Sequence, residues 1–287
     1  MAVLSLEHVS YIYGEGTPFE IRALDDVSLS VREGTVTGII GHTGSGKSTM
    51  VQLFNGLEKP TAGRVLLDGK DIWAEPKKMR DIRFRVGLVM QYPEYQLFEE
   101  TIRADIAFGP RNMGLAEEEI ARRTKEAAAF VGLEAALLDR SPFELSGGQK
   151  RRAAIAGIMA MRPEILVLDE PAAGLDPRGR DVILQGIRAY GKATGSTVII
   201  VSHSMEDMAA YCDDIIVMSH AKVCLFGTRD EVFANASKLT DVGLDVPQIT
   251  HLMMLLRARG VAVPEGIYTV EAATAALRKL LGKGHTV

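Results

Sequence analysis

The sequence predicts an α/β fold with a mainly parallel sheet, an antiparallel β layer at the N-terminus, an inserted helical subdomain and a small C-terminal helical appendage. Three observations predict it. Apolar runs of buried-strand length alternate with helix-like segments, a glycine-rich loop joins one run to a helix, and a long stretch between two runs is helical in pattern. The 287 residues, 47% of them apolar, suffice for a substantial core in one large domain or two small ones.

The N-terminal segments favour an antiparallel layer. Apolar and polar residues alternate from Val3 to Val9, and the pattern repeats from Val27 to Val31 after the turn-rich stretch Gly14 to Pro18. The compact apolar run Val36 to Ile40 then leads through a glycine loop into a helix-like segment. A strand, loop and helix in this order begin a parallel α/β unit.

Further apolar runs alternate with helix-like segments along the chain, so right-handed crossovers and a mainly parallel sheet are expected. The runs that we expect to be strands are Val86 to Met90, Ile165 to Leu168, Val198 to Val201 and Ile215 to Met218. The segments that we expect to be helices include Glu117 to Val131, Gln149 to Met161 and Arg178 to Tyr190.

Changes in pattern suggest the domain boundaries. We expect one large domain over residues 1–240, with the helical subdomain at about 92–162, and an appendage over 241–287. Two amphipathic patterns in the appendage, Val246 to Arg259 and Val270 to Leu281, predict helices. These helices form either a small packed unit or a surface for a partner subunit.

Charge and composition exclude several classes of protein. With 33 Lys plus Arg against 37 Asp plus Glu, the net charge is -4, so no nucleic-acid partner is expected. Cys212 and Cys224 lack the spacing of a zinc site and are expected to be reduced and buried. The sequence has no secretory signal and no membrane-spanning run, so we expect a soluble, intracellular chain that would reach a membrane by docking on other subunits.

A phosphate-binding loop follows the strand that starts at Val36. The segment from Gly41 to Ser48, GHTGSGKS, fits G-x-x-x-x-G-K-[ST] with a strand before it and a helix after it. Backbone N–H groups of such a loop surround phosphates, whereas the alternative is a merely flexible glycine turn. Lys47 would reach the β- and γ-phosphates, and Ser48 would hold Mg²⁺. The residues expected to bind nucleotide here are Gly41, Gly44, Ser45, Gly46, Lys47, Ser48 and Thr49.

Two carboxylates follow the apolar run that begins at Ile165. Ligands bind at the carboxyl ends of strands in open parallel sheets, so Asp169 and Glu170 stand at the edge expected for a nucleotide. Asp169 is the expected partner of Mg²⁺ alongside Ser48, and Glu170 is the expected general base for an attacking water. Adjacent acids are common on surfaces, but their position here predicts hydrolysis of the nucleotide rather than phosphoryl transfer to another metabolite.

A second anion site is indicated before a later helix. Ser146, Gly147, Gly148 and Gln149 follow Leu145 and offer a serine and two glycines at a helix N-terminus. One nucleotide does not need two such sites from the same face. The pattern therefore suggests that a second molecule contributes to the site.

Together with Gly174-Leu175-Asp176 and His203, these motifs resemble those of the ATP-binding cassette (ABC) ATPases, over roughly residues 3–235. The resemblance implies a head-to-tail dimer with a paralogue or a second copy, in which the 145–149 segment of one subunit closes over ATP bound by the other. It implies that Gln91 senses Mg²⁺ and water, that His203 contacts the γ-phosphate, and that Asp176 couples the two sites. Tyr13 matches the aromatic that stacks on adenine, with Tyr11 as a possible substitute.

The segments around Tyr92 to Thr101, Asp105 to Gly114 and Ser141 to Glu144 are similar to the ATPases of energy-coupling-factor (ECF) transporters. That resemblance implies a peripheral subunit at the cytoplasmic face of the cell membrane. It would energise uptake of a vitamin or transition-metal ion through a transmembrane coupling subunit and a substrate-binding membrane subunit.

A partner helix would dock in a groove between Gln91 and the inserted helices. The apolar candidates for its lining could equally be core residues of the subdomain. They are Leu97, Phe98, Ile106 and Phe108.

Two other functions compete with the transporter. One is a soluble ABC ATPase acting on ribosomes or DNA, which usually has tandem cassettes or a long coiled-coil insertion, and neither is present here. The other is a regulatory module that binds ATP without turnover, against which Glu170 and His203 argue.

Overall fold

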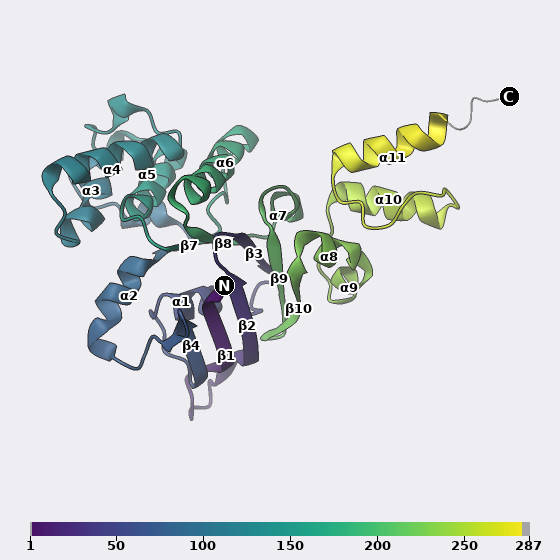
Figure 1. Cartoon of the computed structure of the whole chain (residues 1–287), viewed down its shortest axis with the longest axis horizontal. Helices are drawn as coiled ribbons and strands as arrows, with labels where there is room; N and C mark the ends of the chain where they lie inside the picture. Colours follow the sequence, from purple (N-terminus) through teal and green to yellow (C-terminus); the bar gives the residue numbers. More distant parts are fainter. Residues whose placement is uncertain (1, 283–287) are drawn as a thin grey trace.

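The computed structural model describes residues 2–282, which form two sheets, an inserted group of helices and a C-terminal helical segment (Figure 1). The first sheet is antiparallel, with the strand order β2-β1-β4-β5. Its strands are β1 (Ala2–Tyr13), β2 (Ile21–Arg32), β4 (Ala62–Leu67) and β5 (Lys70–Asp71). The predicted N-terminal antiparallel layer is confirmed, although the sequence pattern did not identify β4 and β5.

The second sheet has the strand order β10-β9-β3-β8-β7-β6 and is parallel except for the pair β9 and β10. Every residue of β3, β7, β8 and β9 is buried, because these strands are covered on both faces. Exposed residues alternate along β10, as expected of an edge strand, and here Cys224 is exposed rather than buried as predicted. The strands are β3 (Val36–Gly41), β6 (Val86–Val89), β7 (Ile165–Asp169), β8 (Thr197–Val201), β9 (Asp214–Ser219) and β10 (Lys222–Thr228).

Helices cover the parallel sheet and form a subdomain between β6 and β7 (Figure 1). The subdomain contains α3 (Ile102–Asn112), α4 (Glu117–Phe130) and α5 (Gly147–Ala160), with short 3-10 helices η2 (Pro93–Gln96), η3 (Ala135–Leu137) and η4 (Pro142–Glu144). The remaining helices before residue 242 are α1 (Lys47–Phe54), η1 (Pro76–Lys78), α2 (Met79–Arg85), α6 (Pro177–Thr194), α7 (Met205–Tyr211), α8 (Arg229–Ala234) and α9 (Ala236–Asp241).

The core has two large parts. In one, the antiparallel sheet and α1 pack on residues of the parallel sheet such as Ile39 and Val167. In the other, the inserted helices and α6 pack around residues such as Leu168 and Ile200. Successive residues of β7 and β8 thus point into different clusters, as the alternation of side chains along a strand requires. The strand ends that carry chemistry are fixed from both faces.

The C-terminal segment folds as two helices, α10 (Gln248–Ala258) and α11 (Val270–Gly282), which extend away from the sheets (Figure 1). They share a small apolar cluster made of Met253, Val263, Ile267 and Ala273. Within residues 2–282, no helix is long and apolar enough to cross a membrane.

Candidate functional site

A cavity of about 430 Å³ lies at the carboxyl edge of the parallel sheet, where the phosphate loop meets the residues that follow β6, β7 and β8. Its size is that of a small-molecule site. The edge is the one predicted from the order of strands and loops. The residues that line it are Tyr13, Ile21, Arg22, Ala23, Thr43, Gly44, Gly46, Lys47, Ser48, Thr49, Gln91, Asp169, Glu170 and His203.

Glycine is required in the phosphate loop for space as well as for conformation. Gly46 has φ +102°, and a Cβ atom there would overlap the carbonyl oxygen of Ala23. A Cβ atom at Gly41 would overlap the backbone oxygen of Met218 in β9. The loop therefore lies directly against the sheet edge. Gly41 and Ser45 support it from behind and do not line the cavity, and the hydroxyl of Ser45 is buried without a hydrogen-bond partner.

Lys47 is the first residue of α1 and is 6% exposed. Its Nζ donates hydrogen bonds to the backbone oxygens of Gly41 (2.7 Å) and His42 (2.8 Å). Burial lowers the pKa of this ammonium group, while the nearby carboxylates Glu170 and Asp169 oppose the shift. The lysine is thus folded into its own loop, from which its cation can reach a phosphate in the cavity.

Asp169, the last residue of β7, accepts a hydrogen bond from Ser48 of the phosphate loop. Burial raises the pKa of Asp169, and the bond from Ser48 and the charge of Lys47 partly offset that rise. Both oxygen donors line the cavity together with the amide of Gln91.

These donors fit Mg²⁺, which prefers oxygen ligands and binds through one or two carboxylates plus substrate phosphates. Over residues 2–282 no cluster of three or more His, Cys, Asp or Glu side chains could hold a metal by itself. Ser48, Asp169 and Gln91 would therefore complete a set of ligands together with phosphate oxygens.

Glu170 follows β7 with φ +53°, a left-handed conformation that is uncommon for a residue with a side chain. Its backbone N–H donates to the oxygen of Val201 (3.0 Å), which fixes the turn against β8. Burial, with a contribution from Asp169, raises the pKa of the Glu170 carboxyl to about 7. A carboxyl with this pKa is suited to accept a proton near neutral pH.

His203 lies beside Glu170, with Nε2 3.3 Å from the Oε1 of the carboxyl. That oxygen is buried and has no aligned hydrogen-bond partner. Burial and the charge of Lys47 lower the pKa of His203, so its imidazole is neutral at pH 7. The pair presents a free carboxylate oxygen and a neutral imidazole to the cavity.

Tyr13, rather than Tyr11, lines the cavity. The Tyr13 hydroxyl is hydrogen-bonded to Oγ1 of Thr49 (3.1 Å), and its ring remains 40% exposed. Tyr11 meets Tyr13 edge to face and donates its own hydroxyl to Glu58. Of the two tyrosines, Tyr13 is therefore the one placed to meet a base in the cavity.

The second predicted anion site lies in a separate hollow of about 600 Å³, which shares no lining residue with the first cavity. Ser146 caps α5 by accepting a hydrogen bond from the N–H of Gln149, whose side chain accepts one from the N–H of Ser146. Asp176 lines the same hollow and caps α6 through the N–H of Gly179 (2.8 Å). The lining also includes Gly148 but not Gly147 or Gln149. One chain thus brings the 146–149 segment and Asp176 together, away from the phosphate loop.

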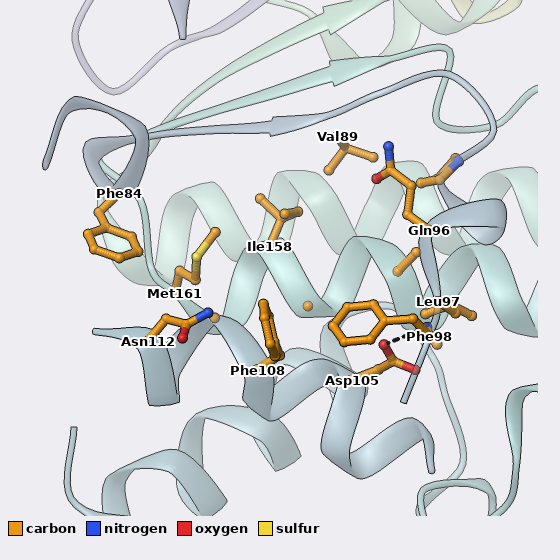
Figure 2. A pocket seen from close by; sticks show the side chains of 15 residues that line it. Phe84, Val89, Gln96, Leu97, Phe98, Asp105, Phe108, Asn112, Ile158 and Met161 are labelled. Atoms are coloured by element: carbon orange, nitrogen blue, oxygen red, sulfur yellow. Dashed lines mark hydrogen bonds between the residues drawn. The ribbon is translucent and has the colours of Figure 1, made fainter. Parts of the chain in front are cut away.

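A third hollow is an apolar groove of about 290 Å³ between η2, α3 and α5 (Figure 2). Phe98 and Phe108 meet edge to face in it, at 4.8 Å between ring centroids, and are 65% and 41% exposed. Leu97 also lines the groove, whereas Ile106 is fully buried in the core. Asp105 accepts hydrogen bonds from the backbone N–H groups of Phe98 and Glu99, which anchors the segment that carries Phe98.

Sequence reasoning missed several residues. Ile21, Arg22 and Ala23 of β2 line the nucleotide cavity, but they belong to no motif, and only the sheet pairing brings them there. Arg151 belongs to no motif either, yet it is 4% exposed and bonded within the chain. Its place in a run of three basic residues gave no signal of burial.

Residues 24–173 match the family model described as ABC transporter. The chain is 53% identical over 279 residues to the energy-coupling factor transporter ATP-binding protein EcfA2 of Clostridium acetobutylicum, covering 97% of this chain and 98% of that protein. It is 54% identical over 270 residues to EcfA2 of Caldanaerobacter subterraneus, covering 94% of each.

Comparison with solved structures gives the same family. The chain resembles cbiO1 of Clostridium perfringens, part of the ABC transporter complex cbiONQ, with a TM-score of 0.75, 41% identity, and coverage of 88% of this chain and 99% of that one. It also resembles the cassette MJ0796 in a dimer bound to ADP and Pi, with a TM-score of 0.71, 29% identity, and coverage of 79% and 98%. The chain therefore belongs to the ABC transporter family and, within it, to the energy-coupling factor transporter ATP-binding proteins of the EcfA2 type.

Proposed function

We propose that this chain is the ATP-hydrolysing subunit of an ECF-type importer, and that it energises uptake of a vitamin or transition-metal ion through membrane partner subunits. The observation that carries the proposal is the separation of the two half-sites. The phosphate loop, Asp169 and Glu170 line one cavity, while Ser146, Gly148 and Asp176 line another. Either half becomes a closed site only when a second cassette, a paralogue or a second copy, lies head to tail against the first.

In the proposed reaction, Lys47 exchanges its two backbone acceptors for phosphate oxygens. Ser48, Asp169 and Gln91 would hold Mg²⁺ with the nucleotide, and the ion would neutralise charge on the phosphates. The free Oε1 of Glu170 accepts a proton from the attacking water, and the neutral imidazole of His203 contacts the γ-phosphate. Tyr13 stacks on adenine.

The work of transport comes from different affinities of ATP for the open and closed dimers, since a ligand shifts an equilibrium only by that difference. Opening and closing of the dimer would be transmitted to the membrane through the groove, because its exposed aromatic rings can bind a helix of a transmembrane coupling subunit. That subunit would in turn carry the substrate-binding membrane subunit. The chain would then lie peripherally at the cytoplasmic face of the cell membrane.

Replacing Glu170 tests the hydrolytic role. We expect Glu170→Gln to lower kcat for ATP hydrolysis by about 10²- to 10⁴-fold, because the proton acceptor is lost. Binding of ATP should persist, since the substitution keeps the size of the side chain. Glu164→Gln is the matched control, because Glu164 precedes β7 at the opposite end of the same strand and pairs with Arg85. Hydrolysis by Glu170→Gln at the native rate would contradict the assignment.

Co-purification from detergent-solubilised membranes tests the transporter role. We expect the native chain to bring down integral membrane subunits, identified by mass spectrometry, and Phe98→Asp in the groove to lose them. Phe226→Asp is the control, since Phe226 is an exposed phenylalanine on the edge strand β10. Recovery of ribosomal proteins or DNA, with no membrane protein, would instead support a soluble ABC ATPase.

A further inference from the structure

Three parts of the molecule meet at the buried side chain of Arg151. Its guanidinium belongs to α5, the helix that Ser146 caps, and it makes a two-pronged ion pair with Glu94 of η2 at 2.9 and 2.7 Å. It also donates a hydrogen bond to the backbone oxygen of Ala173 in the loop after β7. The side chains of Arg151 and Glu94 are 5% and 16% exposed, so the ion pair is buried rather than at the surface. We call the contacts of Arg151 with Glu94 and Ala173 the joint.

One branch of the joint leads to the catalytic carboxylate. The N–H of Ala173 donates to the backbone oxygen of Glu170 (3.3 Å), so Arg151 holds the turn that begins at Glu170. Since Glu170 has a left-handed backbone conformation, the turn needs support from its surroundings. The same loop continues to Asp176, which lines the hollow that also contains Ser146.

The other branch leads to the groove. Glu94 lies in η2 between Pro93 and Gln96, both of which line the groove, and Figure 2 shows Gln96 and Leu97 at its rim. At the other end of this segment, Gln91 lines the nucleotide cavity. The guanidinium of Arg151 also lies over the ring of Tyr92, 5.8 Å from its centroid. The segment that joins cavity and groove is thus held at its middle by one side chain.

We propose that Arg151, through Glu94 and Ala173, is a positioning residue that couples the groove to the hydrolytic site. Movement of the groove wall would displace Glu94 and, through the guanidinium, the turn at Glu170. Conversely, closure of the nucleotide site would displace the groove wall. The joint can transmit such displacements because the guanidinium is planar and its hydrogen-bond donors are fixed in a fork. The inference rests on the proposed function, since it needs ATP hydrolysis at Glu170.

The test measures steady-state ATP hydrolysis by the full-length chain in the assembly in which it is isolated. We expect Arg151→Gln and Glu94→Gln each to lower kcat by about 10- to 100-fold, with KM almost unchanged, because misplacement of a reacting group acts on the chemical step. The double variant should be no slower than either single one, because all three break one joint. Arg151→Lys, which keeps the charge but loses the fork, should lie in between and guards against failure to fold.

Arg103→Gln is the matched control. Arg103 makes a two-pronged ion pair with Asp139 in the same subdomain, at 2.7 and 3.0 Å, but touches neither branch. We expect native kcat from it. Independent, multiplicative losses in Arg151→Gln and Glu94→Gln, or native kcat in folded Arg151→Lys and Arg151→Gln, would overturn the inference.

A second readout separates coupling from mere structural support. Hydrogen exchange of residues 92–98 is measured with and without Mg²⁺ and a non-hydrolysable ATP analogue. We expect the analogue to change exchange there in the native chain and in Arg103→Gln, and to change it less in Arg151→Lys. An undiminished response in Arg151→Lys would overturn the inference. A native chain that binds but does not hydrolyse ATP would instead refute the proposed function.

Discussion

The nucleotide cavity and the groove are built in opposite ways. Polar groups in the cavity come largely from short contiguous motifs, the loop that contains Gly46 and Lys47 and the strand end that contains Asp169 and Glu170. The groove is lined mostly by apolar side chains, which come mainly from residues 93–112, where η2 and α3 lie, and from α5 and Met161, which follow much later in the chain. A chemical site can therefore be read from local sequence, whereas an apolar surface is distinguished from core only by packing.

Replacing two neighbouring apolar residues of α3 tests that distinction most strongly. Ile106→Ala should lower the free energy of unfolding by about 2–5 kcal/mol, because Ile106 is fully buried and its loss leaves a cavity. Phe108→Ala should cost about 1 kcal/mol, mainly the edge-to-face contact with Phe98. Denaturant unfolding of both variants measures the difference. Equal losses would mean that Phe108 is a core residue rather than part of the groove surface.

Alanine substitutions at two glycines of the phosphate loop distinguish the cost of steric overlap from the cost of backbone strain. Gly46→Ala should cost about 3 kcal/mol, because the new Cβ overlaps the Ala23 carbonyl as well as facing a strained φ. Gly44→Ala should cost about 1 kcal/mol, since Gly44 has φ +80° but open space around it. Thermal unfolding without nucleotide compares the two. If Gly44→Ala is as unstable as Gly46→Ala, steric overlap is not the reason that glycine is required at position 46.

The pKa of Glu170 predicts the pH dependence of the nucleotide cavity. The folded-state pKa of about 7 lies above the ordinary value of 4.5, so the carboxylate that accepts a proton is lost as the pH falls below 7. We expect kcat/KM for ATP to fall about tenfold per pH unit below that point. A profile that stays level down to pH 5 would contradict this protonation equilibrium.

The same shift links pH to stability. Between about 4.5 and 7 the folded chain retains a proton on Glu170 that the unfolded chain releases, so this group favours folding less as the pH rises. Glu170→Gln removes that penalty. We therefore expect its melting temperature without nucleotide to exceed that of the native chain by a few degrees at pH 8, and the difference to vanish at pH 4.

Sequence patterns predicted the elements whose signal is local. The runs at β3, β7, β8 and β9 were found because strands buried on both faces are continuously apolar. β10 was missed, because it is an edge strand in which exposed residues alternate with partly buried ones, so no continuous apolar run marks it. The exposed Cys224 on β10 follows from the same cause.

The sequence by itself determined the identity and order of the chemical groups, because a phosphate loop and a carboxylate pair need particular residue types at fixed spacing. Only the tertiary structure decided that Tyr13 rather than Tyr11 faces the cavity, that Ile106 is core while Phe108 is surface, and that Arg151 is buried against Glu94. Each of these depends on which distant segments pack together. Packing is a property of the whole chain, and no window of neighbouring residues contains it.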